Sequence, residues 1–170
     1  MKVGTTKILV AGMGTALLMG SGSNAQAATV AGPVEAVLVK PLSLVKTDDL
    51  DFGTLVSSPI AGTATIDANT GVQTTTGGVL SAGGTPKRAE FVGVGGSGLL
   101  ITIAISASPT LTNGTGGSMP STLAVQGGTG FRLLPGTGVQ TFRVGGTLNV
   151  GANQQDGNYT GTFSLTVNYF

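Results

Sequence analysis

The stretch YTGTFSLTVNYF, residues 159–170, alternates apolar or aromatic residues with polar ones. A period of two is typical of a β-strand that covers a hydrophobic core with one face and meets water with the other. The apolar side consists of Tyr159, Gly161, Phe163, Leu165, Val167 and Tyr169. Because burial of one large apolar side chain contributes roughly 1.5 to 3 kcal/mol, the sequence predicts that this terminal strand is part of the core.

The segments upstream have the same character. They are rich in Thr, Val, Ile and Phe, and turn-forming stretches such as DANTG, SAGGTP and NQQDG separate them. The predicted strands are residues 63–66, 72–76, 89–94, 99–106, 122–126, 139–144 and 147–150. No window after residue 28 keeps a helical period, so no helix is available for the crossover that a parallel sheet needs. The sequence therefore predicts an all-β antiparallel sandwich.

Composition restricts the classes of function. The chain has 170 residues, of which 40% are apolar and 9% charged, and it contains no Cys and no His. One domain of this size folds without disulfides, and neither a zinc site nor a His-containing triad is available. The net charge is +1, and no basic cluster exceeds the pair Lys87 and Arg88. We therefore expect no nucleic-acid binding, no cofactor, no metal and no enzymatic activity.

The first 27 residues have the pattern of a signal peptide. Lys2 and Lys7 precede the uncharged apolar residues 8–20, and the small-residue motif Ala25-Gln26-Ala27 follows. The apolar run is too short for a bilayer core of about 30 Å, which disfavours the alternative of an uncleaved anchor. We expect cleavage before Ala28, a mature chain without a transmembrane segment, and export to the cell surface or the extracellular space.

Residues 28–40, ATVAGPVEAVLVK, form a second distinctive segment. One face carries Val30, Gly32, Val34, Ala36 and Leu38 at period two, and Pro41 follows. After it LSLVKTDDLDFG, residues 42–53, is predicted to begin the first strand of the sandwich. Proline lacks the N–H that a sheet ladder uses, so it marks an edge or a break. The segment is predicted to be extended and separable from the domain of residues 41–170, able to lie in its own domain or in a neighbour's. The alternative is a first strand paired within its own sandwich, with Pro41 at a bulge.

Three motifs at the two ends of the domain carry a family resemblance. They are L-x-F-G at residues 50–53, G-T-L-x-V at residues 146–150 and G-x-Y-x-G-x-F-x-x-x-V-x-Y at residues 157–169. With them the chain resembles a family of exported bacterial domains of unknown function, related to the spore-coat-U and archaic chaperone-usher pilins. The chain departs from many pilins in having no Cys, and Pro33 interrupts the candidate donor segment.

The resemblance implies an immunoglobulin-like sandwich that lacks one strand. In the pilin relatives a periplasmic chaperone fills the gap, and at the outer-membrane usher the N-terminal extension of the next subunit replaces it. Here residues 28–40 would be the donor, and the groove beside Tyr159, Phe163, Leu165, Val167 and Tyr169 would be the acceptor. Head-to-tail insertion does not close on itself, so it produces a fibre, a homo-polymer.

Other motifs have simpler interpretations. The G-x-G-x-x-G of Gly93, Gly95 and Gly98 precedes a predicted strand rather than the helix that a nucleotide site needs. The S-x-x-K of residues 43–46 lacks its partner motifs. Asp48, Asp49 and Asp51 do not have the spacing of an EF-hand loop, so they predict a solvated turn. Asn113 and Asn158, each in an N-x-T motif, are predicted to lie in turns.

The sequence thus predicts a pilin-like fibre subunit assembled by strand donation. The alternative is a secreted monomeric binding module, in which residues 28–40 fold back into their own sheet and loops such as residues 110–120 contact a carbohydrate or a surface.

Overall fold

The computed structural model describes residue 33 and residues 35–170, and it divides the chain into the units Met1–Ala36 and Val37–Phe170. The predicted signal peptide lies outside the described residues, and so do Val30, Gly32 and Val34 of the predicted donor face. The fold described below is that of the second unit.

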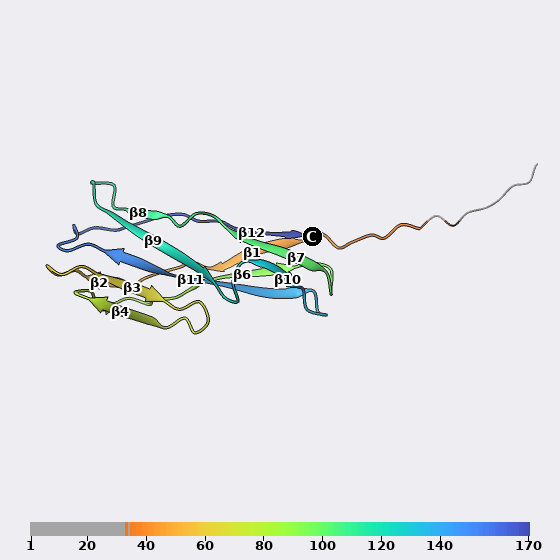
Figure 1. Ribbon diagram of the computed structural model, residues 1–170, viewed down its shortest axis with the longest axis horizontal. Coiled ribbons are helices and arrows are strands. Elements are labelled where there is room, and N and C mark those ends of the chain that lie inside the picture. The colour runs from red at the N-terminus through yellow and green to blue at the C-terminus, as the bar shows by residue number, and fades with distance from the viewer. Residues whose placement is uncertain (1–32, 34) are drawn as a thin grey trace, which may run out of the picture. The chain divides into compact units, whose positions relative to one another are not determined.

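The described residues form twelve strands and no helix (Figure 1). The strands are β1 (Ser43–Asp48), β2 (Thr54–Val56), β3 (Gly62–Ile66), β4 (Gln73–Gly77), β5 (Leu80–Gly83), β6 (Ala89–Val94), β7 (Leu100–Ile105), β8 (Thr110–Thr112), β9 (Ser118–Val125), β10 (Gly130–Leu133), β11 (Val139–Val150) and β12 (Leu165–Tyr169). Every strand pair is antiparallel. The predicted all-β antiparallel class is therefore confirmed.

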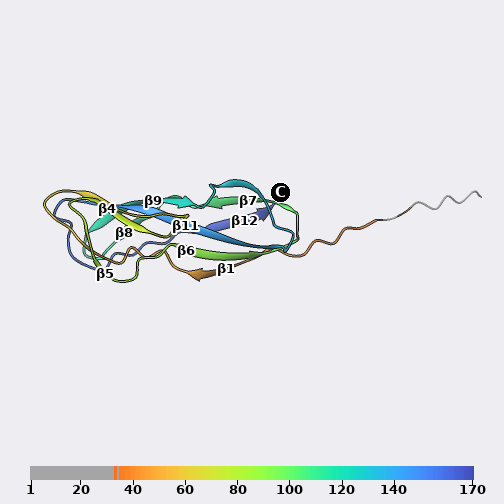
Figure 2. The same ribbon diagram turned by 90° about the horizontal axis from the view of Figure 1, so that it is seen from below.

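The strands form a sandwich of two principal sheets. The larger sheet has the order β1-β6-β11-β3-β4, and β9 pairs with the other edge of β11 and carries β8. The smaller sheet has the order β10-β7-β12, and β2 and β5 form a separate two-stranded ribbon. Seen edge-on, β7 and β12 lie on one side of β11 and β1 lies with β6 on the other (Figure 2).

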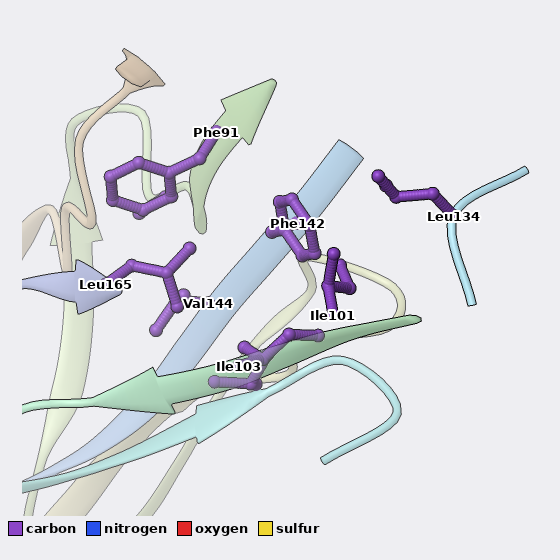
Figure 3. Packing of buried hydrophobic residues seen from close by; sticks show 9 residues of the cluster. Phe91, Ile101, Ile103, Leu134, Phe142, Val144 and Leu165 are labelled. Carbon is purple, nitrogen blue, oxygen red and sulfur yellow. The ribbon is translucent and has the colours of Figure 1, made fainter. Parts of the chain in front are cut away.

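Two hydrophobic clusters fill the interior. The first joins both principal sheets, with Ala89, Phe91, Ile101, Ile103, Val125, Leu134, Phe142, Val144 and Leu165. Figure 3 shows members of this cluster converging from β6, β7, β11 and β12 on one interior. The second cluster, around Phe52, Ile66, Val79, Met119 and Leu148, lies at the end of the sandwich that holds β2 in Figure 1 and β5 in Figure 2. Leu50 packs against both clusters, so the core is continuous.

Strand β11 is longer than predicted. The sequence indicates a break at Gly145 and Gly146, but the strand runs through both and pairs with β6, β3 and β9 in turn. A Cβ on Gly145 would lie 2.6 Å from the backbone nitrogen of Ala68. Glycine is needed here because two backbone segments approach closely. In the sequence, however, two consecutive glycines resemble a turn, so a break was predicted.

Four short strands were not predicted, namely β2, β5, β8 and β10. Residues 110–120, expected to be a loop, form the hairpin of β8 and β9 with only residues 113–117 as its turn. That interpretation was wrong because Thr110–Thr112 is too short to display a period, and Pro120 lies inside β9 where proline disfavours a strand assignment. The N-x-T motif at Asn113 does lie in a turn, where the side-chain oxygen of Asn113 accepts the N–H groups of Thr115 and Gly117.

The terminal strand is shorter than residues 159–170. Regular pairing covers only Leu165–Tyr169, against β7, so Tyr159 and Phe163 lie outside the strand. Pairing stops because β7 ends at Ile105 and residues 106–109, which end in Pro109, interrupt the ladder until Thr112 pairs with Thr160. Burial still follows the predicted alternation, with Leu165 buried, Phe163 and Val167 half-buried and the residues between them exposed.

Candidate functional site

Strands β1 and β12 are the open edges of the two sheets on one side of the sandwich. Within the described residues β1 pairs only with β6 and β12 only with β7. The two edges face each other, because a Cβ placed on Gly95 would lie within 3.0 Å of both Leu42 and Tyr169. No backbone hydrogen bond of the described residues joins residues 41–57 to residues 159–170.

The half of this side near Tyr169 is closed by side chains. Leu42 and Leu44 from the β1 side and Val167 and Tyr169 from the β12 side all pack half-buried on the first core cluster. At this end the two edges therefore meet through apolar contact, although within the described residues no backbone hydrogen bond joins them.

The other half is hollow. Two adjoining cavities, of about 300 and about 590 Å³, lie between residues 49–57 and residues 154–163. They share Leu50, Phe52, Leu111, Tyr159 and Thr160 as walls. We call the two cavities together the lateral groove. Its remaining apolar lining consists of Ala89, Phe91, Pro109, Leu123 and Phe163 in the smaller cavity and Leu55, Val56, Met119, Leu148 and Val150 in the larger one. The larger cavity also has polar walls, among them Asp51, Gln154, Gln155, Asp156 and Asn158.

The backbone beside the groove has free hydrogen-bonding groups. Thr160 pairs with Thr112 through two bonds of 3.0 Å, and the N–H of Ser164 is accepted by the Ser106 hydroxyl over 3.0 Å. Among the described residues, Gly161, Thr162 and Phe163 between them make no backbone hydrogen bond. Free N–H and C=O groups next to apolar pockets are what an added β-strand requires, because the strand pairs with the groups and its alternate side chains fill the pockets.

Both tyrosines of the chain fix the borders of this side. The Tyr159 hydroxyl donates to the carbonyl of Gln155 over 2.6 Å and accepts the amide of Gln154 over 2.7 Å. The Tyr169 hydroxyl donates to the carbonyl of Lys40 over 2.7 Å and accepts the N–H of Gly96 over 2.6 Å. Tyr159 thus forms a wall of the groove, whereas Tyr169 holds the point at which the N-terminal segment meets the sandwich.

The described part of that segment is apolar and solvent-exposed. Residues 37–40 form no strand, and Val37 is 90% and Leu38 100% exposed. Ala36 belongs to the other structural unit. Leu38 is therefore the one residue of the predicted donor face that lies in the same unit as the sandwich. Neither Val37 nor Leu38 is paired into the sheet of its own sandwich.

The three clustered acids each have a local partner. Asp48 pairs with Lys87 at 2.7 Å, Asp49 pairs with Lys46, and the Asp51 carboxylate accepts the N–H of Gly53. The Lys46 ammonium lowers the pKa of the Asp49 carboxyl, and Asp48 raises the pKa of Lys87. In the described residues no group of three acidic side chains is arranged to hold a metal ion. These contacts suit a solvated turn.

The glycine motif and the ion pairs of Glu90 are not among the lining of the groove, whereas Asp156 lines its larger cavity. Gly93, Gly95 and Gly98 are followed by β7, not by a helix. Glu90, on β6, accepts from Arg143 over 2.8 Å and from Arg88 over 3.1 Å, and the hydrogen bond from Arg143 is the main reason that the pKa of Glu90 is lowered.

Within the part that the structure describes, no helix has the length and apolar character needed to cross a membrane.

The sequence indicated half of this site. The alternation of residues 159–170 indicated the wall formed by Tyr159 and Phe163, but Phe52, Leu111 and Met119 were not identified as lining residues. The L-x-F-G motif was the available signal for Leu50 and Phe52, since both line the groove.

Comparison with known proteins gives a family for the domain. Neither the curated proteins nor the solved structures contain a significant match to the chain. Residues 42–169 match the domain of unknown function DUF4402. This match covers both edges of the groove and every strand of the sandwich, so the chain belongs to the DUF4402 family.

Proposed function

We propose that the chain is a structural subunit of a bacterial surface fibre, assembled by donation of residues 28–40 from one copy to the lateral groove of the next. The observation that carries the proposal is the coexistence of two features: a groove with apolar side chains in its walls and unpaired backbone groups at Gly161–Phe163 beside it, and an apolar segment, Val37 and Leu38, that its own sandwich leaves exposed. Each is the kind of surface that the other would cover.

The donor is long enough to cover the open part of the groove. At about 3.3 Å per extended residue, its twelve steps span about 40 Å, whereas the four steps from Tyr159 to Phe163, which lie beside the cavities, span about 13 Å. Insertion would direct Val30, Val34 and Leu38 toward the apolar walls of the groove. Burying these three side chains contributes about 5 to 8 kcal/mol before ordering costs.

The direction of insertion follows from the position of Lys40. Tyr169 holds Lys40 at the end of the sandwich where β1 begins and β12 ends, whereas Tyr159 lies toward the end that holds β2 (Figure 1). If two sandwiches meet end to end, a donor leaving the Lys40 end of one enters the groove of the other at its β2 end. The donor then runs antiparallel to β12 of the acceptor, which suits a sheet in which every described pair is antiparallel.

Export and assembly factors complete the proposal. The signal peptide predicted in residues 1–27 would deliver the subunit to the periplasm, where a chaperone would cover the groove and an usher would exchange it for the donor of the next copy. The proposed function does not include a catalytic activity.

The alternative of a self-contained monomeric binding module requires the leading segment to fold back into its own sheet. The exposure of Val37 and Leu38 and the absence of a strand in residues 37–40 do not favour it.

A charge placed on either face of the donor tests the proposal. Residues 28–170 would be prepared as three proteins, namely the parent, Leu38→Asp and Val37→Asp. Both positions are almost fully exposed in the free subunit, so neither change should affect its folding. In an inserted strand, however, Leu38 faces the groove and Val37 faces away.

We expect fibres from the parent and from Val37→Asp by negative-stain microscopy, and none from Leu38→Asp. A synthetic peptide of residues 28–40 at 100 times its dissociation constant should raise the Tm of Leu38→Asp by about 10 °C. Fibres from Leu38→Asp, or no response to the peptide, would overturn the proposal.

A further inference from the structure

Two patches of exposed apolar side chains lie at opposite ends of the sandwich. One, the exit patch, consists of Leu100 (39% exposed), Phe131 (64%), Leu133 (62%) and Phe170 (80%). The other, the groove-end patch, consists of Val56 (49%), Ile60 (67%) and Leu80 (65%). In Figure 1 β2 and in Figure 2 β5 lie at the left end, whereas the C-terminus lies at the right end of the sandwich in both.

The exit patch is continuous across the smaller sheet. Leu133 of β10 pairs in register with Leu100 of β7, and the N–H of Phe170 donates to the carbonyl of Leu100 over 3.1 Å. The rings of Phe131 and Phe170 meet edge to face, with their centroids 4.7 Å apart. Two adjacent aromatic rings that pack on each other yet remain largely exposed are characteristic of an interaction site.

The groove-end patch borders the mouth of the lateral groove. Val56 lines the larger cavity and pairs in register with Leu80. Ile60 follows in the same loop, where the neighbouring Ser58 accepts the N–H of Asn153 over 2.8 Å. This patch therefore lies where a donor strand would enter.

We propose that the exit patch of one copy docks on the groove-end patch of the copy that takes up its donor segment, so that strand exchange is accompanied by a contact between the two sandwich bodies. This inference rests on the proposed function. The short link between the donor and the exit patch indicates that a second copy docks there. The Lys40 carbonyl accepts a hydrogen bond from Tyr169, the neighbour of Phe170, and Leu38 lies only two residues before Lys40. Two residues span at most about 7 Å.

The copy whose groove holds Leu38 must therefore lie against the end that carries Phe170. At the entry of its groove that copy presents Val56, which lines the larger cavity. Leu80, paired with Val56, and Ile60 are the exposed apolar side chains of the adjoining ribbon and loop. The two patches differ in composition and position, so the contact is heterologous and repeats along a fibre without closing. It would restrict the angle between successive subunits, which the donor strand alone leaves free.

Cysteine cross-linking tests this contact directly, because the chain contains no Cys. The double variant Ile60→Cys with Phe170→Cys places one thiol in each patch at exposed positions. A disulfide requires Cα atoms within about 7 Å. The matched control is Val72→Cys with Phe170→Cys, since Val72 is also exposed (59%) but lies outside both patches.

After mild oxidation of assembled fibres, boiling in denaturant and electrophoresis without reductant, we expect a ladder of covalent multimers from Ile60→Cys with Phe170→Cys and monomers from the control. Fibres without a ladder, or equal ladders from both, would overturn the docking while leaving strand donation intact. Failure of both variants and the parent to form fibres would overturn the proposed function and the docking together.

A second measurement separates docking from groove binding. Phe131→Ser with Phe170→Ser should lower the guanidinium concentration at which fibres dissociate. Made in the Leu38→Asp background, the same pair should leave the Tm increase caused by the peptide of residues 28–40 unchanged. Parent-like fibre dissociation would contradict the docking.

Discussion

The hydroxyl of Tyr169 donates a hydrogen bond to the carbonyl oxygen of Lys40, 129 residues earlier in the chain, over 2.7 Å. Because the same hydroxyl accepts the N–H of Gly96, one side chain ties together the start of the first strand, the end of the last and the turn between β6 and β7. In the proposed fibre this side chain fixes the place from which the donor leaves the sandwich.

Replacement of Tyr169 by Phe removes both hydrogen bonds and retains the ring. A typical hydrogen bond contributes about 1 kcal/mol, so we expect the free energy of unfolding to fall by about 1 to 2 kcal/mol in urea titrations. Asn168→Ala is the control, since Asn168 is exposed and points away from the core. Equal stability of Tyr169→Phe and the parent would mean that this tether, the pair of hydrogen bonds from the Tyr169 hydroxyl to Lys40 and Gly96, contributes nothing to stability.

Gly95→Ala tests the close packing behind that tether. The new Cβ would lie 2.5 Å from the Tyr169 hydroxyl and 2.9 Å from Leu42. Such overpacking typically costs about 1 to 3 kcal/mol, measurable as a lower Tm. Gly136→Ala, where a Cβ would meet no atom within 4 Å, should be close to neutral. A neutral Gly95→Ala would show that the two sheet edges separate easily.

Leu165→Ala tests whether the last strand belongs to the core. Leu165 is 8% exposed and packs with Val144 and Phe91 in the first cluster. Truncation of a buried leucine costs about 2 to 5 kcal/mol, whereas Leu133→Ala, at a position 62% exposed, should change stability by less than about 0.5 kcal/mol. Denaturant unfolding measures both losses of stability. If Leu165→Ala and Leu133→Ala lost similar amounts, the placement of the last strand in the core would be contradicted.

The ion pairs of Glu90 predict a pH dependence. Arg143 and then Arg88 lower the pKa of Glu90 in the folded protein below its ordinary value of 4.5. The stability that Glu90 contributes is therefore fully present above pH 4.5 and is lost as the pH falls through the lowered pKa. Glu90→Gln should be less stable than the parent at pH 7, and the difference should disappear in acid.

Thermal unfolding of both proteins between pH 2 and pH 7 measures this difference. A gap in Tm that persists unchanged at the lowest pH would point to lost packing rather than lost charge. Arg143→Gln serves as the reciprocal variant, since removing the principal cation should reproduce most of the same pH dependence.

Local signals in the sequence were sufficient for most strands and for the class of fold. Strand β6 has the predicted bounds, and β3, β4 and β7 differ from the predicted ones by a single residue at one or both ends. Periodicity is reliable there because each strand has one face in the core, and that face selects apolar residues. It was unreliable at Gly145, where the glycine meets another backbone segment, and at β8, which is too short for a period.

The sequence by itself determined which residues of most strands face inward, where most turns lie and that the leading segment carries an apolar face, because these depend on neighbours along the chain. Only the tertiary structure decided which strands are edges and that Tyr169 meets Lys40. It also decided that Leu50 and Phe52 share a groove with Tyr159. Pairing and cavities arise between segments about a hundred residues apart, and a local pattern cannot encode what lies opposite it.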